Sequence, residues 1–265
     1  MVVDDDVRTP QPGREPRRVV VTGGGSGIGL SVAEAFAGHG DRVAIVGRDE
    51  KRLSAAIEQS ADAPGELIAV SGDVASGPGA RQILRQAVEA IGGVEILVNN
   101  AGICIEELVV ETSDEAWRAL VDTNLSGAFY MARETGRLMI DQGRGGVILN
   151  TSSINAPMPE RGYVPYSMTK AAIDCMTQGL SLELAEYGIR VCGVRPGYIE
   201  TPMLGKVLED SADLEAWREE ETARVALGRF GTGADCAGAF LFLASPAASY
   251  ITGASVTVDG GRLLT

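Results

Sequence analysis

The stretch YSMTK, residues 166–170, places a tyrosine and a lysine four positions apart. On a helix, residues i and i+4 lie on the same face, so the phenol of Tyr166 and the ammonium of Lys170 would share a small volume. Such a pair can exchange a proton with a substrate, because a nearby positive charge favours the phenolate. The spacing also fits an ordinary helix surface, and the rest of the chain has to decide between the two.

The elements that would carry this pair follow an α/β pattern. From Arg18 onward, short apolar runs alternate with helical stretches, and the runs read RVVVTG, DRVAIVG, ELIAVSG, VEILVNN, GVILNTS, IRVCGVRPG and ASVTVDG. Near-continuous apolar strands separated by helices are typical of a parallel sheet covered on both faces. We therefore predict a single doubly wound α/β domain over residues 18–265, with about seven strands.

The composition of the chain argues against several classes of partner and several types of site. The 265 residues carry a formal net charge of −13, which disfavours nucleic acid or anionic membranes as partners and favours a small molecule. His39 is the only histidine, which excludes a histidine zinc site and a Ser-His-Asp triad, so no metal is expected. The cysteines form no C-x-x-C pair, and reduced thiols are expected in Cys104, Cys175, Cys192 and Cys236.

The beginning of the chain, MVVDDDVRTPQPGREPRR, lacks the apolar segment of a signal peptide. No apolar run in the sequence is long enough to span a bilayer. We expect a cytoplasmic protein in which residues 1–17, rich in Asp, Pro and Arg, form a disordered arm.

A glycine-rich turn, TGGGSGIG at residues 22–29, follows the first predicted strand. Glycines let the backbone turn tightly and approach a phosphate at a helix N-terminus. In doubly wound sheets ligands bind beyond the carboxyl ends of the strands, where this turn would lie. The turn therefore suggests a dinucleotide, although the strict G-x-G-x-x-G spacing is not met and a plain tight turn uses the same residues.

The pattern T-G-x-x-x-G-x-G resembles the cofactor turn of the short-chain dehydrogenase/reductases, and the resemblance runs from about Arg17 to the C-terminus. The family's later motifs follow in order: GDV with Asp73 and Val74, NNAG at 99–102, TNLSGAF, NTSSI, YSMTK and RPGYIETP at 195–202. Ser153 precedes Tyr166 by 13 residues, which is the separation usual in this family. Thr151 and Ser152 do not have this separation from Tyr166. The resemblance implies a Rossmann-type fold and a nicotinamide cofactor.

The resemblance also implies a catalytic tetrad of Asn124, Ser153, Tyr166 and Lys170. Tyr166 would be the general acid/base while a hydride passes to or from the nicotinamide, and Ser153 would hold the substrate oxygen. Lys170 would bind the nicotinamide ribose and lower the pKa of the phenol by up to about 3 units, and Asn124 would position a water. The implied cofactor-binding residues are Thr22, Gly23, Gly25, Ser26, Gly27, Ile28, Gly29, Arg48, Asp73, Val74, Asn100, Ala101, Gly102, Tyr166, Lys170, Pro196, Gly197, Ile199 and Thr201.

The end of the second strand bears on the choice between NADP and NAD. An acidic residue there would accept hydrogen bonds from the adenosine ribose and select NAD. Here the strand ends with Gly47 and Arg48, and a guanidinium can pair with a 2′-phosphate, so NADP is favoured. Asp49, one residue further on, keeps NAD open, as does Ser26 where some NADP-dependent enzymes carry a basic residue.

The substrate pocket implied by the resemblance is mostly apolar. It would be lined by Ile103, Cys104, the loop 155–163, Tyr198 and a flap near residues 200–225. Glu160 and Arg161 are expected to point to water, the acidic stretch 209–221 to be a solvated helix face, and Trp217 to be a packing residue. A secondary alcohol or ketone of modest size is the predicted substrate.

Two alternative functions remain. One is a 3-oxoacyl reductase acting on carrier-protein thioesters, although an acidic carrier protein would meet a chain of like charge. The other is a nicotinamide-binding protein without turnover, which would not need to retain both Tyr166 and Lys170. The resemblance further implies a homotetramer in which the apolar stretch FLFLAS and the last strand ASVTVDGG pack across a twofold axis.

Overall fold

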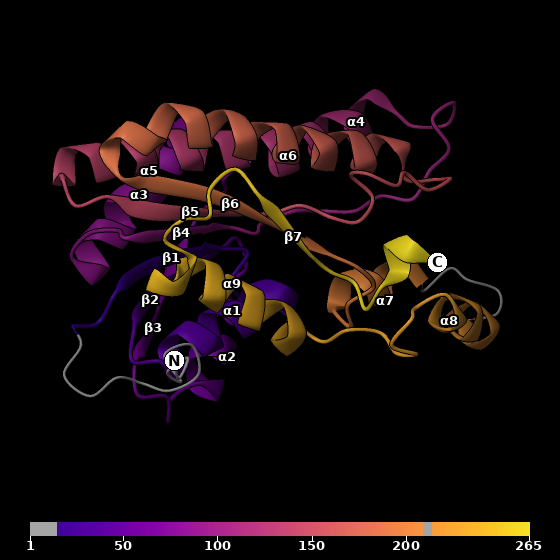
Figure 1. The fold of residues 1–265 in the computed structure, drawn as a ribbon, viewed down its shortest axis with the longest axis horizontal. Helices are drawn as coiled ribbons and strands as arrows, with labels where there is room; N and C mark the ends of the chain where they lie inside the picture. Colours follow the sequence, from indigo (N-terminus) through magenta and orange to yellow (C-terminus); the bar gives the residue numbers. More distant parts are fainter. Residues whose placement is uncertain (1–14, 209–213) are drawn as a thin grey trace.

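The computed structural model describes residues 15–208 and 214–265, and the described chain forms a parallel sheet covered by helices (Figure 1). Seven strands pair in the order β3-β2-β1-β4-β5-β6-β7 within these residues. They are β1 Arg18–Thr22, β2 Arg42–Gly47, β3 Glu66–Ser71, β4 Ile96–Asn99, β5 Gly146–Thr151, β6 Ile189–Pro196 and β7 Ser255–Val258. The predicted doubly wound α/β fold, including its strand number, is confirmed.

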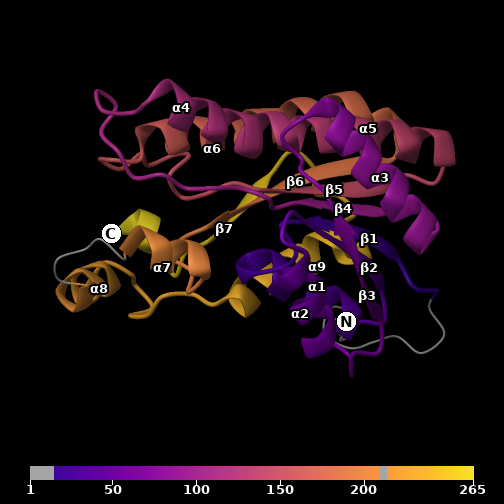
Figure 2. The same ribbon diagram turned by 180° about the vertical axis from the view of Figure 1, so that it is seen from behind.

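The helices lie on both faces of the sheet (Figures 1 and 2). One face carries α1 (Gly27–Gly38), α2 (Glu50–Gln59) and α9 (Gly233–Ala244), and the other carries α3 (Gly77–Ile91), α5 (Gly127–Gln142) and α6 (Val164–Leu184). Further helical segments are α4 (Asp114–Leu120), the π-helix η1 (Val121–Ser126), α7 (Pro202–Leu208), α8 (Leu214–Ala223) and the 3₁₀ turns η2 (Ala185–Tyr187), η3 (Pro246–Ala248) and η4 (Arg262–Leu264).

Alternate residues of each strand supply two separate cores. In β1, Val19 and Val21 pack with α1 and α9, whereas Val20 packs with α3 and α5 on the opposite face. All three are 0% exposed. Successive side chains of a strand point to opposite faces, so a strand buried on both must be apolar throughout. This is the physical reason for the continuous apolar runs in the sequence.

Arg17, the last residue of the predicted arm, packs against the sheet domain. Arg17, assigned from the sequence to the arm, binds Asp41 through its guanidinium at 2.6 Å and stacks over the Phe36 ring at 5.2 Å. Asp41 is fully buried, and a buried carboxylate is stable only when it is paired. Arg17 is therefore part of the domain, while the prediction for residues 1–14 lies outside the described residues.

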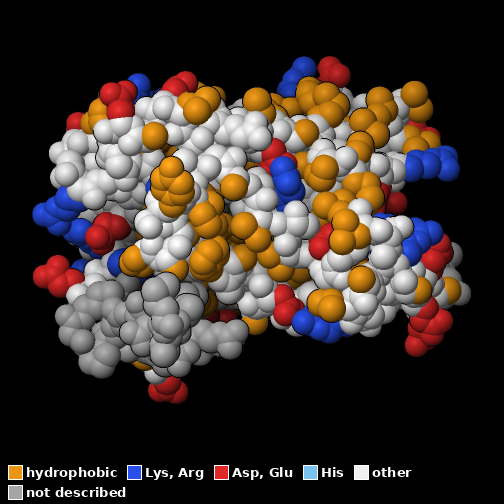
Figure 3. Space-filling view, viewed as in Figure 1, with side chains coloured by type: hydrophobic (Ala, Val, Ile, Leu, Met, Phe, Trp, Pro, Cys, Tyr) orange, Lys and Arg blue, Asp and Glu red, His pale blue; other side chains and the backbone are white. Residues whose placement is uncertain are grey.

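Short helices gather at one end of the molecule, and apolar side chains gather on one of its faces. Figure 1 shows α4, α7 and α8 gathered at one end of the molecule, together with the C-terminal turn η4. In the space-filling view, apolar side chains gather over the area of α9 and β7 (Figure 3). No helix in residues 15–208 or 214–265 combines the length and the apolar character needed to cross a bilayer.

Candidate active site

Tyr166 and Lys170 lie in the first two turns of α6, a helix that begins with Pro165 among its first residues, where proline is favourable. Lys170 is 5% exposed, and its ammonium nitrogen lies 5.6 Å from the centroid of the Tyr166 ring. The four-residue spacing therefore brings the two side chains together, as predicted. A solvated surface pair is excluded by the burial of the lysine.

Ser153 lies two residues after the end of β5, close enough to the phenol of Tyr166 to lower its pKa. Its Oγ accepts a bond of 3.1 Å from the backbone N–H of Asn155. The neighbouring hydroxyls are used elsewhere: Ser152 donates to the carbonyl of Lys170 at 3.1 Å, and Thr151 faces Asn100. Of the three candidates in NTSSI, Ser153 alone influences the pKa of Tyr166.

Asn124 supports this group from outside the cavity. It lies in η1, and π-helical turns occur often at functional sites. Its amide accepts from the backbone N–H of Ile103 at 2.8 Å and donates to the Ile103 carbonyl at 2.9 Å and to Thr169 at 3.2 Å. The side chain thus joins η1 to the segment after β4 and to α6.

The pKa of Tyr166 differs from the sequence expectation. Lys170 donates to the carbonyl of Thr151 at 2.9 Å rather than to the phenol. Burial raises the pKa of Tyr166 above its usual value, the Cys104 thiol adds to this, and the neighbouring Ser153 hydroxyl opposes it only in part. Burial also lowers the pKa of Lys170 to about 8. The expected lowering of the phenol pKa was wrong, because withdrawal of water from the phenolate outweighs the lysine.

The glycine turn follows β1 as predicted. Gly23 and Gly27 have φ values of +66° and +55°, a region that side chains other than glycine rarely adopt. Thr22 accepts hydrogen bonds from the backbone N–H groups of Asn100 and Ala101 at 3.0 and 3.1 Å, which fixes the turn against the end of β4. The N-cap residue of α1, Ser26, makes no side-chain cap, so the first N–H groups of this helix are available to an anion.

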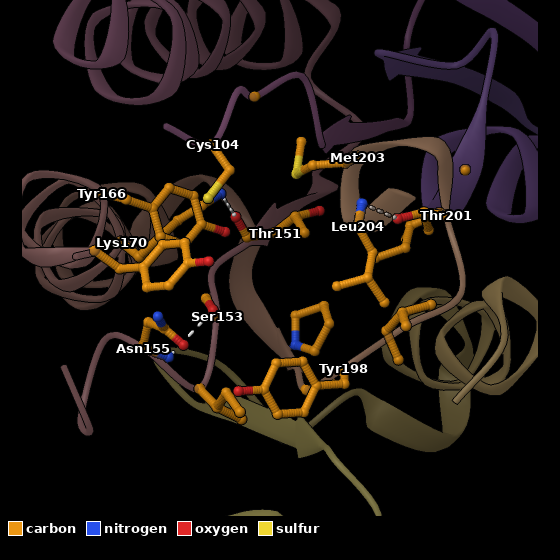
Figure 4. Close-up of a pocket in the computed structure, with 18 of the residues that line it drawn as sticks. Cys104, Thr151, Ser153, Asn155, Tyr166, Lys170, Tyr198, Thr201, Met203 and Leu204 are labelled. Carbon is orange, nitrogen blue, oxygen red and sulfur yellow. Dashed lines mark hydrogen bonds between the residues drawn. The ribbon is translucent and has the colours of Figure 1, made fainter. Parts of the chain in front are cut away.

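A cavity of 1010 Å³ runs from this turn to Ser153, Tyr166 and Lys170. Figure 4 shows Tyr166, Lys170, Ser153 and Asn155 on one side, with Thr201, Met203 and Leu204 on another. Of the predicted site residues, the cavity is lined by Gly23, Ser26, Gly27, Ile28, Asn100, Ala101, Gly102, Ser153, Tyr166, Lys170, Pro196, Gly197, Ile199 and Thr201. Its size, its glycine turn and its uncapped helix fit a dinucleotide together with a substrate.

The remaining predicted site residues lie outside the cavity lining: Thr22, Gly25, Gly29, Arg48, Asp73, Val74 and Asn124. Arg48, two-thirds exposed at the end of β2, pairs with Asp73 at 3.6 Å. Asp49 accepts from the backbone N–H groups of Lys51 and Arg52 at 3.1 and 3.2 Å and so caps α2. The Asp49 carboxylate, which could have bound the adenosine ribose of NAD, is therefore already hydrogen-bonded to the first turn of α2.

Sequence reasoning missed the polar far end of the cavity. Glu160 does not point to water, because it accepts a hydrogen bond of 3.1 Å from the Tyr198 hydroxyl. Glu221, assigned to a solvated helix face, is 7% exposed, and Trp217 lines the cavity as well as packing on Tyr198. Arg262, three residues before the last residue of the chain, was not predicted to be a site residue. No local pattern marks these residues, since they meet only in the folded chain.

Comparison with known proteins decides the family. A family model described as enoyl-(acyl carrier protein) reductase matches residues 23–262. The chain is 43% identical over 249 residues to L-rhamnose 1-dehydrogenase (NAD(P)(+)) of Azotobacter vinelandii, covering 92% of this chain and 96% of that protein. The chain belongs to the short-chain dehydrogenase/reductase family.

Two other members of the family show how far the likeness extends. A 3-oxoacyl-[acyl-carrier-protein] reductase of Chlamydia pneumoniae is 37% identical, covering 92% of this chain and 96% of the other. The crystal structure of a short-chain type dehydrogenase/reductase from Mycobacterium marinum matches with a TM-score of 0.88 at 33% identity, covering 98% and 99% of the two chains. The chain is thus an NAD(P)-dependent oxidoreductase of the short-chain type that acts on alcohols and carbonyl compounds, as the sequence predicted.

Proposed function

We propose that the chain transfers a hydride between NADP(H) and a small secondary alcohol or ketone, with Tyr166 as the general acid/base. The observation that supports this most directly is that Ser153, Tyr166 and Lys170 line one cavity that continues to the glycine turn. Lys170 and Asn124 act as the remaining members of the tetrad. The turn residues, Asn100 to Gly102 and the segment Pro196 to Thr201 bind the dinucleotide.

The proposed roles follow from the geometry of the chain's own groups. Because its pKa is raised, Tyr166 keeps its proton at neutral pH and is ready to donate it to a carbonyl oxygen held by Ser153. Lys170, with a pKa of about 8, stays charged at pH 7 and carries positive charge behind the phenol. The bound nicotinamide supplies or accepts the hydride, and its positive charge in the oxidised form would favour the phenolate needed for alcohol oxidation.

Substitution of Tyr166 tests the assignment. Tyr166→Phe keeps the ring and removes the proton, so kcat should fall at least a hundredfold while cofactor affinity, measured by titration of protein fluorescence, stays within about twofold. Ser153→Ala should also lower kcat, and Ser152→Ala is its matched control, because the Ser152 hydroxyl is bound to the carbonyl of Lys170. A Tyr166→Phe variant that keeps a tenth of the wild-type kcat would overturn the proposed role.

The preference for NADP is supported by the end of β2. Arg48 is exposed there and weakly paired, whereas Asp49 is committed to capping α2. Arg48→Ala should lower kcat/KM for NADP(H) about tenfold to a hundredfold and leave NAD(H) nearly unchanged, since a charge-assisted bond contributes about 1.5–3 kcal/mol. A Cβ at Gly47 would make only ordinary contact with Leu53, so Gly47→Asp should fold and reverse the preference. Preference for NAD(H) in the wild type, lost in Asp49→Ala, would contradict this assignment.

The second candidate function is reduction of carrier-bound 3-oxoacyl groups, which the 37% identity to the Chlamydia pneumoniae reductase favours. The net charge of −13 argues against docking of an acidic carrier protein. Rates with an acetoacetyl thioester on a carrier protein and on a small thiol distinguish the two functions. A strong preference for the carrier-bound form would establish the second.

Assembly as a homotetramer in the cytoplasm is the last part of the proposal. Within residues 15–208 and 214–265, β7 pairs on one side only, with β6, and partly buried apolar residues of α9 lie beside it (Figure 3). Phe129, Met168 and Leu182 on α5 and α6 are exposed by 42%, 55% and 82%, so a second apolar face needs a partner. All four cysteines are free, as expected in a reducing compartment. A monomer in light scattering at micromolar concentration would contradict the tetramer.

A further inference from the structure

The far end of the cavity carries a cluster of charged and hydroxyl-bearing side chains, here termed the distal polar cluster: Glu160, Tyr198, Glu221 and Arg262. They come from the loop before α6, the segment after β6, α8 and the C-terminal turn η4. Arg262 and Glu221 are 8% and 7% exposed. Bringing charged groups this far out of water is costly, so their pairing deserves a functional explanation.

Arg262 is held in place by ion pairs, but not all of its hydrogen-bond donors have a partner among the described residues. Its Nη2 pairs with Glu221 at 3.3 Å and lies 3.7 Å from Glu160, and the guanidinium carbon is 6.0 Å from the Tyr198 ring centroid. Its buried Nε–H has no hydrogen-bond partner among the described residues. An unpaired buried donor is unfavourable by about 1–3 kcal/mol, so the guanidinium has hydrogen-bonding capacity that the described residues do not use.

Asn155 provides a second unpaired polar group nearer to the reacting centre. The residue is 7% exposed and lines the cavity beside Ser153 (Figure 4). Its backbone N–H is bound to Ser153, but its side-chain amide makes no hydrogen bond within the described residues. An amide can donate and accept at once, which suits a hydroxyl group.

The charges of the lining point to a neutral ligand. The lining holds three carboxylates, of Glu106, Glu160 and Glu221, and three guanidinium groups, of Arg161, Arg224 and Arg262. Glu160 and Glu106 already accept from the hydroxyls of Tyr198 and Tyr163, so their second lone pairs remain for further O–H donors. An anionic ligand would meet the carboxylates, and an apolar ligand would leave Arg262 and Asn155 unpaired.

We propose that the substrate is a neutral, polyhydroxylated small molecule, a polyol or a sugar, whose hydroxyls remote from the reacting carbon bind Asn155 and the distal polar cluster. The inference rests on the proposed function, which supplies the reaction: the secondary alcohol loses a hydride to NAD(P)⁺ and its hydroxyl proton to Tyr166 and then to solvent, and the carbonyl compound and NAD(P)H are formed. The distal polar cluster then sets which alcohol is placed against Ser153 and Tyr166.

A substrate panel tests this with the full-length chain. The panel contains a hexitol, an aldopyranose, a hexonate, cyclohexanol and an acetoacetyl thioester. The hexitol and the aldopyranose distinguish an open polyol from a ring. At least one of them should exceed cyclohexanol and the hexonate tenfold or more in kcat/KM. A preference for cyclohexanol, the hexonate or the thioester overturns the inference while leaving hydride transfer intact.

Variants locate the contacts. Asn155→Ala removes no existing hydrogen bond of the side chain, so it should fold, and Glu160→Gln removes a charge but keeps an acceptor for Tyr198. Each should lower the ratio of kcat/KM for the preferred polyhydroxylated substrate to that for cyclohexanol by about tenfold to a hundredfold. Glu219→Gln, an exposed carboxylate on α8, is the matched control and should leave the ratio unchanged. An equal loss on both substrates in Asn155→Ala and Glu160→Gln overturns the inference.

Binding separates this inference from the proposed function. The preferred polyhydroxylated compound is titrated calorimetrically into Tyr166→Phe protein with bound cofactor. This measures the affinity of the compound without turnover. Affinity retained in Tyr166→Phe and weakened about tenfold or more by adding Asn155→Ala supports the distal contacts even if the acid/base assignment fails. Absence of binding by both the hexitol and the aldopyranose, or affinity unchanged in the double variant, overturns them.

Discussion

Replacing Lys170 by methionine should stabilise the protein at neutral pH while it removes activity. The residue is 5% exposed, and its pKa falls from 10.5 to about 8 because burial disfavours the ammonium. At about 1.36 kcal/mol per pH unit, this drop corresponds to roughly 3 kcal/mol lost from the free energy of unfolding at pH 7. Methionine also removes the hydrogen bond to the Thr151 carbonyl, worth about 1 kcal/mol, so the net gain is about 2 kcal/mol.

The gain must depend on pH in a definite direction. Below pH 8 the lysine is charged in both states, and the full cost of burial is present in the wild type. Between about pH 8 and 10.5 the unfolded chain still binds the proton while the folded chain releases it, so the wild type gains stability relative to Lys170→Met as pH rises. The advantage of the variant therefore shrinks across this window.

Urea unfolding at pH 7.0, 8.5 and 9.5, followed by tryptophan fluorescence, measures this difference. Lys51→Met is the matched control, because Lys51 is exposed at the start of α2 and should show no such trend. A Lys170→Met variant that is no more stable than the wild type at pH 7, or whose difference does not change with pH, would refute the claim that the buried ammonium is costly.

Three further predictions concern the framework. Gly29→Ala should abolish cofactor binding in a fluorescence titration and lower the melting temperature, because a Cβ there would overlap a backbone carbonyl oxygen of the glycine turn. Asp41→Ala should lower the free energy of unfolding in urea by about 3–5 kcal/mol, because it leaves the guanidinium of Arg17 without its buried partner. Iodoacetamide at pH 8 should label Cys175, which is exposed, before Cys104, whose pKa burial raises to about 12; peptide mass spectrometry showing the reverse order would contradict this.

The architecture and the Tyr166–Lys170 pair could be predicted from the order of the amino acids. The strands could be predicted because a sheet buried on both faces requires continuous apolar runs, as in Val19, Val20 and Val21. The pair Tyr166 and Lys170 was readable because helix geometry fixes the relation of residues four apart. Both features depend only on the spacing of residues along the chain, so they can be predicted without knowledge of the tertiary structure.

The tertiary structure alone decided the pKa of Tyr166 and the polar end of the cavity. A pKa depends on how much water the fold removes around a group, which the distance between two sequence positions does not reveal. Glu160, Glu221 and Arg262 are separated by 61 and 41 positions, and each alone reads as a solvated charge. Only the approach of the loop before α6, α8 and the C-terminal turn places them in one cavity, and with them the specificity proposed for this enzyme.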